Sequence, residues 1–149
     1  MFSLFKKKPA PVYPSESKWN VSTGSHDGRA MIVRRNQSAT DLIGHVDYAH
    51  RVGFAMPLLT PNEDGLPTGE ESSVLNEIED ALADSIETGQ DGLLTVIVTT
   101  SGMREFVFYT RKPGDIESVA TAIRQAFPSY DIQFYIASDK NWDGYKQFL

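Results

Sequence analysis

The sequence contains no cysteine, and this absence removes several classes of function at once. Disulfide bonds, thiolate catalysis, iron–sulfur clusters and cysteine-based zinc sites all need the sulfur atom of that residue. A chain without cysteine is typical of a reducing compartment, so we expect a cytoplasmic protein. The remaining residues indicate no cofactor, and we predict none.

Long apolar runs are also missing. A helix that crosses a bilayer needs about 20 consecutive apolar residues, and no segment approaches that length. At the N-terminus Phe2, Leu4 and Phe5 precede Lys6-Lys7-Lys8, which is the reverse of a secretory signal. Residues 1–17 are predicted to be a flexible tail and linker. Weak docking of this tail on a membrane or partner, through its apolar side chains and lysines, is the alternative.

The composition is that of an ordinary globular protein. The chain has 149 residues, of which 40% are hydrophobic and 23% charged, and a chain of this size buries roughly 70% of its unfolded surface. One core is therefore expected. We predict a single α+β domain over residues 18–149.

Turn chemistry and alternation predict the first strands. Residues 18–25 and 29–35 are enriched in β-branched and apolar residues, and Asp27-Gly28 between them is typical of a hairpin turn. From Val46 to Leu58 apolar residues alternate, which indicates a long third strand. His45, Asp47, Arg51, Gly53 and Ala55 are expected on its opposite face.

Two amphipathic helices follow from the apolar spacing. Thr68 is predicted to cap the first helix, with Glu71 closing a reciprocal capping box and Gly89 ending the helix. A second helical stripe extends from Ile116 to Phe127. The residues that recur every four positions in the first helix are Val74, Ile78, Leu82 and Ile86.

The remaining segments complete the predicted topology. Residues 93–100 and 104–110 form a second hairpin around Ser101-Gly102, residues 130–136 form a last strand, and an apolar tailpiece ends the chain. The order β-β-β-α-β-β-α-β contains βαββαβ after the leading hairpin. We therefore predict a ferredoxin-like βαββαβ antiparallel sheet with both helices on one face, preceded by an N-terminal β-hairpin.

Charge is distributed unevenly, because no lysine or arginine occurs between Thr60 and Gly92. This segment carries −10 within a chain of −6, so the remainder sums to +4. Half of the twenty acidic residues lie here. They are Glu63, Asp64, Glu70, Glu71, Glu77, Glu79, Asp80, Asp84, Glu87 and Asp91.

Three interpretations of this acidic segment are open. The first is a solvated face that keeps the protein soluble, and the second is a docking surface for a basic partner protein. The third is a divalent cation held by loop acids, although their spacing matches no calcium loop. Direct binding of nucleic acid is excluded by repulsion. The candidates for partner binding are Glu70, Glu71, Glu77, Asp80 and Asp84.

Motifs for chemistry are absent, since the sequence has no nucleophile elbow, phosphate-binding glycine loop or metalloprotease helix. No catalytic residue is predicted. His45 and Asp47 are weak candidates for a metal site, because two residues on one strand face could share an ion, with Arg51 or Glu105 as neighbours. A metal-dependent enzyme or metal-binding protein using them is the rival to a binding module. A small-ligand sensor with a pocket between the sheet and the hairpin or tailpiece is the third possibility.

Residues 104–109 contain aromatics at positions that resemble the RNA-binding strand of RNA-recognition motifs. Glu105 stands where those motifs have glycine, and the protein is acidic. The aromatics are therefore predicted to lie in the core. Oligomeric state is left open, and a homo-oligomer is compatible with an antiparallel sheet.

Several short segments together resemble a bacterial domain of unknown function, number 695, from about Trp19 to Leu149. This resemblance implies no assigned activity. It also implies a relation to the small acidic protein that inhibits ribonuclease E, and hence binding and modulation of another protein, although this chain lacks the second, inhibitor-like domain. The segments are Val52-Gly53-Phe54-Ala55-Met56-Pro57-Leu58, Gly65-Leu66-Pro67-Thr68 through Glu71, Ile78-Glu79-Asp80, Arg104-Glu105 with Phe108-Tyr109, and Trp142, Tyr145 and Phe148.

Overall fold

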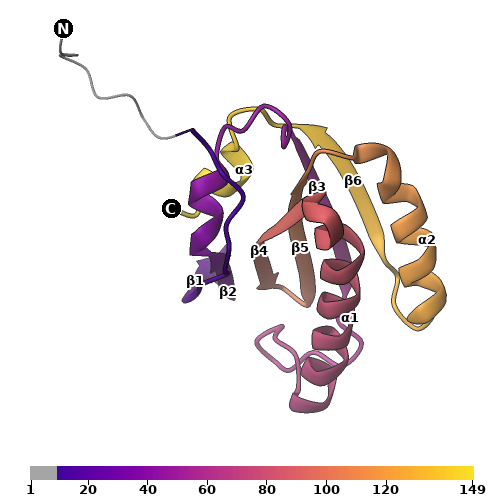
Figure 1. The fold of residues 1–149 in the computed structure, drawn as a ribbon. Coiled ribbons are helices and arrows are strands. Elements are labelled where there is room, and N and C mark those ends of the chain that lie inside the picture. The colour runs from indigo at the N-terminus through magenta and orange to yellow at the C-terminus, as the bar shows by residue number, and fades with distance from the viewer. Residues whose placement is uncertain (1–9) are drawn as a thin grey trace, which may run out of the picture.

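A computed structural model describes residues 10–149 and contains one six-stranded antiparallel sheet with helices on both faces (Figure 1). The predicted α+β class is confirmed. Along the sheet the strand order is β1-β2-β4-β5-β3-β6. The strands are β1 (Trp19–His26), β2 (Arg29–Asn36), β3 (His50–Pro57), β4 (Gly92–Thr100), β5 (Met103–Thr110) and β6 (Gln133–Ser138).

The leading hairpin extends this sheet instead of standing apart from it. Asp27 and Gly28 adopt φ values of 52° and 78°, as the predicted turn requires, and β2 then pairs with β4 from Met31↔Thr100 to Arg35↔Val96. The order of the whole sheet consequently differs from that of a four-stranded ferredoxin-like sheet.

The helices form a layer on each face. Figure 1 shows α1 and α2 together on one side, as predicted, with α3 and the first 3-10 helix on the other. The α-helices are α1 (Gly69–Glu87), α2 (Ile116–Ala126) and α3 (Asp143–Lys146). The 3-10 helices are η1 (Gln37–Leu42), η2 (Thr88–Gln90) and η3 (Pro113–Asp115).

Each face of the sheet has its own apolar core. Under α1 and α2 lie Phe54, Phe106 and Phe108, all fully buried. On the opposite face Tyr109 stacks on Trp142 of the tailpiece, with ring centroids 3.9 Å apart. The aromatics of residues 104–109 therefore lie in the core, as predicted. Apolar burial on both faces is the main stabilising term.

The predicted start of the third strand is wrong. β3 begins at His50, and the residues before it form turns. In these turns the amide of His45 donates to the backbone carbonyl of Leu42, and the amide of Tyr48 donates to the backbone carbonyl of His45. Gly44, at φ 79°, permits this turn. Val46 is consequently 84% exposed, while Tyr48 is buried in the second core.

The capping box is correct in only one half. The Thr68 hydroxyl accepts from the amide of Glu71 at 3.4 Å, which caps α1 as expected. Glu71 does not return the bond. Its side chain is buried and instead accepts from the amides of Leu59 and Thr60, at 2.6 and 2.8 Å.

The residues before β1 lie against the second core. The amide of Val12 donates to the backbone carbonyl of Asp41, and the Tyr13 hydroxyl donates to the backbone carbonyl of Gly92 at 2.8 Å. Residues 1–9, with the predicted docking of the tail, lie outside the described residues, and the boundary at residue 17 stays a prediction. None of the helices in residues 10–149 combines the length and apolarity that crossing a bilayer requires.

Candidate functional site

Four carboxylates form one stripe along the outer face of α1. Glu70, Glu77, Asp80 and Asp84 are exposed, and their spacings of seven, three and four residues repeat with the helical turn. The buried residues of α1 lie on the opposite side of the helix. None of the four carboxylates forms an ion pair with a residue of the described chain. We call these residues the acidic stripe.

Three of the other acids near α1 have partners inside the protein. Glu79 accepts from Arg34 of β2 at 2.7 Å, and Glu87 accepts from the amide of Leu94 at 2.9 Å. Asp91 pairs with arginine and lysine side chains after β5. The ten acids therefore do not form one continuous unpaired patch.

The prediction that Glu71 helps to bind a partner is wrong, because the residue is buried. Besides the two amides it accepts from the Tyr130 hydroxyl at 2.7 Å, and its side chain is only 4% exposed. Burial acts to raise its pKa, but these hydrogen bonds outweigh burial and hold the pKa of Glu71 below its usual value. It ties α1 to the loop after β3 and cannot meet a partner.

An apolar groove borders the acidic stripe. It has a volume of about 270 Å³ and lies between the start of α1 and the end of α2, with Leu59, Val74 and Phe127 among its lining residues. Val74 lies four residues after Glu70 and three before Glu77, so the two carboxylates are its neighbours on the helix surface. Leu59 is 51% exposed at the edge of the groove.

The metal candidates lie in a turn instead of on a strand face. The amide of Asp47 donates to His45 Nδ1 at 3.1 Å, and the Asp47 carboxylate lies 4.0 Å from the same nitrogen. Lys140 lines the hollow beside His45, and its ammonium group would repel a metal ion. Among residues 10–149 no third histidine, aspartate or glutamate joins the pair.

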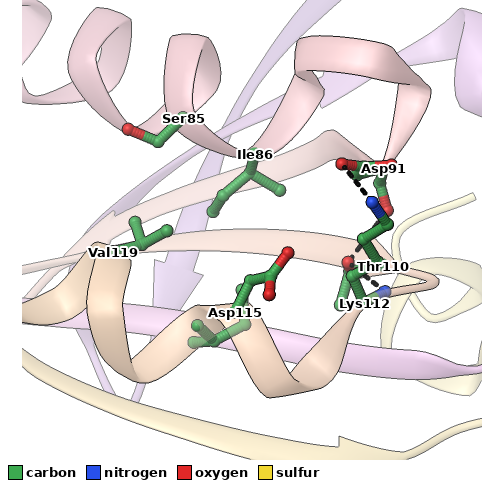
Figure 2. A pocket seen from close by; sticks show the side chains of 8 residues that line it. Ser85, Ile86, Asp91, Thr110, Lys112, Asp115 and Val119 are labelled. Carbon is green, nitrogen blue, oxygen red and sulfur yellow. Dashed lines mark hydrogen bonds and ion pairs between the residues drawn. The ribbon is translucent and has the colours of Figure 1, made fainter.

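The pocket drawn in Figure 2 is too small for a metabolite. Ile86 of α1 and Val119 of α2 border it, and the ion pair of Lys112 with Asp91, 3.4 Å long, stands at one side. Its volume of about 20 Å³ is close to what a single water molecule needs. We assign no ligand to it.

A polar cluster on the opposite face of the sheet was only partly anticipated. Arg51 donates from Nη1 to Asp139 at 2.8 Å, and Tyr109 donates to the same carboxylate at 2.7 Å. Sequence reasoning named Arg51 but missed Asp139, which lies in a loop between β6 and α3. The sequence signal that could have indicated Asp139 is the short polar loop before the apolar tailpiece. The amides of Asp143 and Gly144, at the start of α3, also donate to the Asp139 carboxylate.

Comparison with known proteins decides the family. Residues 17–149 match the family described as "Family of unknown function (DUF695)". The chain belongs to the DUF695 family. No curated protein matches the chain.

Membership in DUF695 confirms the resemblance predicted from the sequence, and it brings no activity with it. Both the acidic stripe and the Arg51 cluster lie within the matched residues. The relation of this DUF695 chain to the ribonuclease E inhibitor stays a prediction, as does its bacterial origin.

Proposed function

We propose that this DUF695 protein is a non-catalytic binding or regulatory module that presents α1 to a basic protein partner. One observation carries the proposal: the acidic stripe leaves four carboxylates exposed on one side of α1, and none of them forms an ion pair among the described residues. Helix stability explains only Glu70, which lies in the first turn of α1, where the helix dipole favours negative charge. Glu77 and Asp80 lie in the middle of the helix, and Asp84 lies in the last turn, where negative charge is unfavourable.

The groove beside the stripe supports the same function. Charged residues at the rim of an interface mainly steer encounter and select partners, whereas apolar anchors in a groove supply most of the affinity. A partner segment with lysine or arginine beside large apolar side chains would match both features. Nucleic acid stays excluded on charge, since phosphates would meet the carboxylates.

The test neutralises the stripe without changing side-chain shape. The full chain is used to capture partners at low salt, and each captured protein is then purified and its affinity measured. A variant with Glu70→Gln, Glu77→Gln, Asp80→Asn and Asp84→Asn is expected to bind about tenfold more weakly, because four rim charges together contribute about 1.4 kcal/mol. Added salt should weaken the wild type and leave the variant nearly unchanged.

A matched control removes four exposed carboxylates elsewhere. Asp27→Asn, Asp41→Asn, Glu117→Gln and Asp131→Asn change the net charge by the same amount outside α1. This control should bind as the wild type does. Equal affinity of the stripe variant and the wild type would end the proposal.

We also propose two finer assignments. The segment from β3 to β6 is a ferredoxin-like unit, supported by its order β4-β5-β3-β6 and by α1 and α2 on one face. An experimental structure with a different pairing of β3 would contradict it. The cytoplasm is proposed as the site of action because the sequence lacks cysteine, and fractionation of cells that express the protein tests this.

A further inference from the structure

A hollow of about 140 Å³ opens on the sheet face that carries the tailpiece. Arg51 of β3, Glu105 of β5 and Tyr135 of β6 line one part of it, so three adjacent strands contribute polar side chains. Val98, Val107 and Phe148 supply an apolar surface in the same hollow. The volume is several times what one water molecule requires.

Arg51 is held rigidly at the edge of this hollow. Its partner Asp139 has a side chain that is only 6% exposed, and the amides of Asp143 and Gly144 donate to that carboxylate at 2.9 and 3.0 Å. Burial acts to raise the pKa of Asp139, but hydrogen bonds, first that from Tyr109, hold it below its usual value. Nη1 of Arg51 donates to Asp139, and the guanidinium also lies within hydrogen-bonding reach of the Tyr135 hydroxyl. A guanidinium carries five N–H groups, so some of them remain for a ligand.

Two glycines make room for the polar side chains. A Cβ atom on Gly53 would lie 2.2 Å from the Tyr135 ring and 2.6 Å from Oε1 of Glu105. A Cβ atom on Gly144 would lie 2.5 Å from Cδ of Arg51. Neither glycine has a positive φ, so close approach of these side chains is what requires them.

Glu105 and Tyr135 lie within hydrogen-bonding reach of each other in the hollow, and the Glu105 carboxylate has further lone pairs for a ligand. The Glu105 carboxylate forms no ion pair with any residue of the described chain. Burial, and then the charge of Glu105, raise the pKa of Tyr135 to about 12, so its hydroxyl stays protonated near neutral pH. Arg51 lies over the Tyr135 ring, with Cζ 5.7 Å from the ring centroid. The hollow thus holds a cation, a carboxylate and a hydroxyl beside an apolar surface.

We infer that this hollow binds a small zwitterion of the α-amino acid class. The ligand carboxylate would accept from the free N–H groups of Arg51, and the ligand ammonium group would donate to Glu105 and Tyr135. An apolar side chain of the ligand would contact Val98 and Val107. The acidic stripe lies on α1 over the opposite sheet face, so this inference does not depend on the proposed function.

Isothermal calorimetry on the full chain tests the inference with the common α-amino acids as probes. At least one is expected to bind saturably at millimolar or lower concentration. Its N-acetyl form, which lacks the ammonium group, and its carboxamide form, which lacks the carboxylate, should each bind about tenfold more weakly or not at all. Amide NMR shifts on binding should centre on Arg51, Gly53 and Glu105.

Variants test the residues without removing a buried partner. Glu105→Gln and Tyr135→Phe should each weaken binding about tenfold while the circular dichroism spectrum stays that of the wild type. Glu117→Gln, on the exposed side of α2, serves as the control and should bind normally. Arg51 is left unchanged, because its removal would leave Asp139 buried without its cation.

Three results would overturn the inference. The first is the absence of saturable binding for every amino acid tested, and the second is binding that both capped forms retain in full. The third is a set of NMR shifts centred away from the hollow. The capped ligands act on the wild-type chain, so the inference stays testable even if a variant fails to fold.

Discussion

Replacing Glu71 by glutamine removes a charge from the interior and leaves the shape of the side chain nearly unchanged. In the wild type Oε2 accepts from the Leu59 amide and the Tyr130 hydroxyl, and Oε1 accepts from the Thr60 amide. Glutamine offers one oxygen in place of two. One of the two amides would therefore face an NH₂ group and lose its acceptor.

The magnitude follows from these contacts. A buried donor without a partner costs about 1–3 kcal/mol, and a hydrogen bond to a charged group contributes about 1.5–3 kcal/mol, roughly twice the neutral value. We expect Glu71→Gln to lower the free energy of unfolding by about 2–4 kcal/mol. For a chain of this length that corresponds to a fall in Tm of roughly 5–15 °C.

Urea unfolding followed by circular dichroism measures the effect, with Glu70→Gln as the exposed neighbouring control. The control should stay within about 0.5 kcal/mol of the wild type. A loss below that limit for Glu71→Gln as well would refute the argument that Glu71 ties α1 to the loop after β3.

The same site makes a prediction about pH. Because the folded pKa of Glu71 is lowered, the unfolded chain binds more protons in acid, and the stability from this group is present above the unfolded pKa of about 4.3. It is lost as the pH falls through the folded pKa. Between neutral pH and acid, Glu71→Gln should therefore lose less stability than the wild type does.

Three further predictions concern single positions. Burial raises the pKa of Glu87, with Asp84 and Glu79 adding to the shift, so its charge destabilises the fold at neutral pH. Glu87→Gln should therefore melt at the same temperature as the wild type, or slightly higher, at pH 7. A clearly lower melting temperature of the variant at pH 7 than at lower pH, each relative to the wild type, would contradict this. Gly53→Ala should destabilise by about 1–3 kcal/mol through overpacking against Tyr135, whereas Gly24→Ala, where nothing lies within 4 Å of the added Cβ, should cost far less in the same denaturant titration. Asp139→Ala should cost about 3–5 kcal/mol, because it leaves Arg51 without its buried partner, and a melting temperature equal to that of the wild type would refute the anchoring role.

Local rules predicted the parts of the fold that depend on neighbouring residues. Asp27-Gly28 and Ser101-Gly102 end their strands because the hairpin turns need positive φ, and both pairs adopt it. The first helix begins after Thr68 because its hydroxyl caps the amide of Glu71. The apolar stripes of α1 and α2 required one apolar core, which they share on one face of the sheet.

Contacts between distant segments set the features that could not be predicted. Alternation continued through Tyr48, but that side chain turns to the second core and donates to the carbonyl of Gln90, 42 residues away. Glu71 matches a capping box until its remote partner Tyr130 is known. Glu79 looked unpaired, yet Arg34 reaches it because β2 joins the sheet beside β4.

The candidate sites also differ in whether neighbouring residues or distant segments form them. The acidic stripe is visible in the sequence because helical spacing alone places its carboxylates on one face. The hollow at Arg51 is assembled from β3, β5, β6 and the tailpiece, and only the sheet order brings these segments together.

Photo-crosslinking in cells tests the docking surface most directly. Ser73 is exposed and lies within the acidic stripe, three residues after Glu70 and four before Glu77, so a benzoylphenylalanine placed there would contact a docked partner. We predict a protein adduct with a basic surface from Ser73, lost when the stripe is neutralised, and no such adduct from Ser22 on the far strand β1. Absence of an adduct at Ser73, or the same adducts at both positions, would contradict the proposal that α1 is the docking surface.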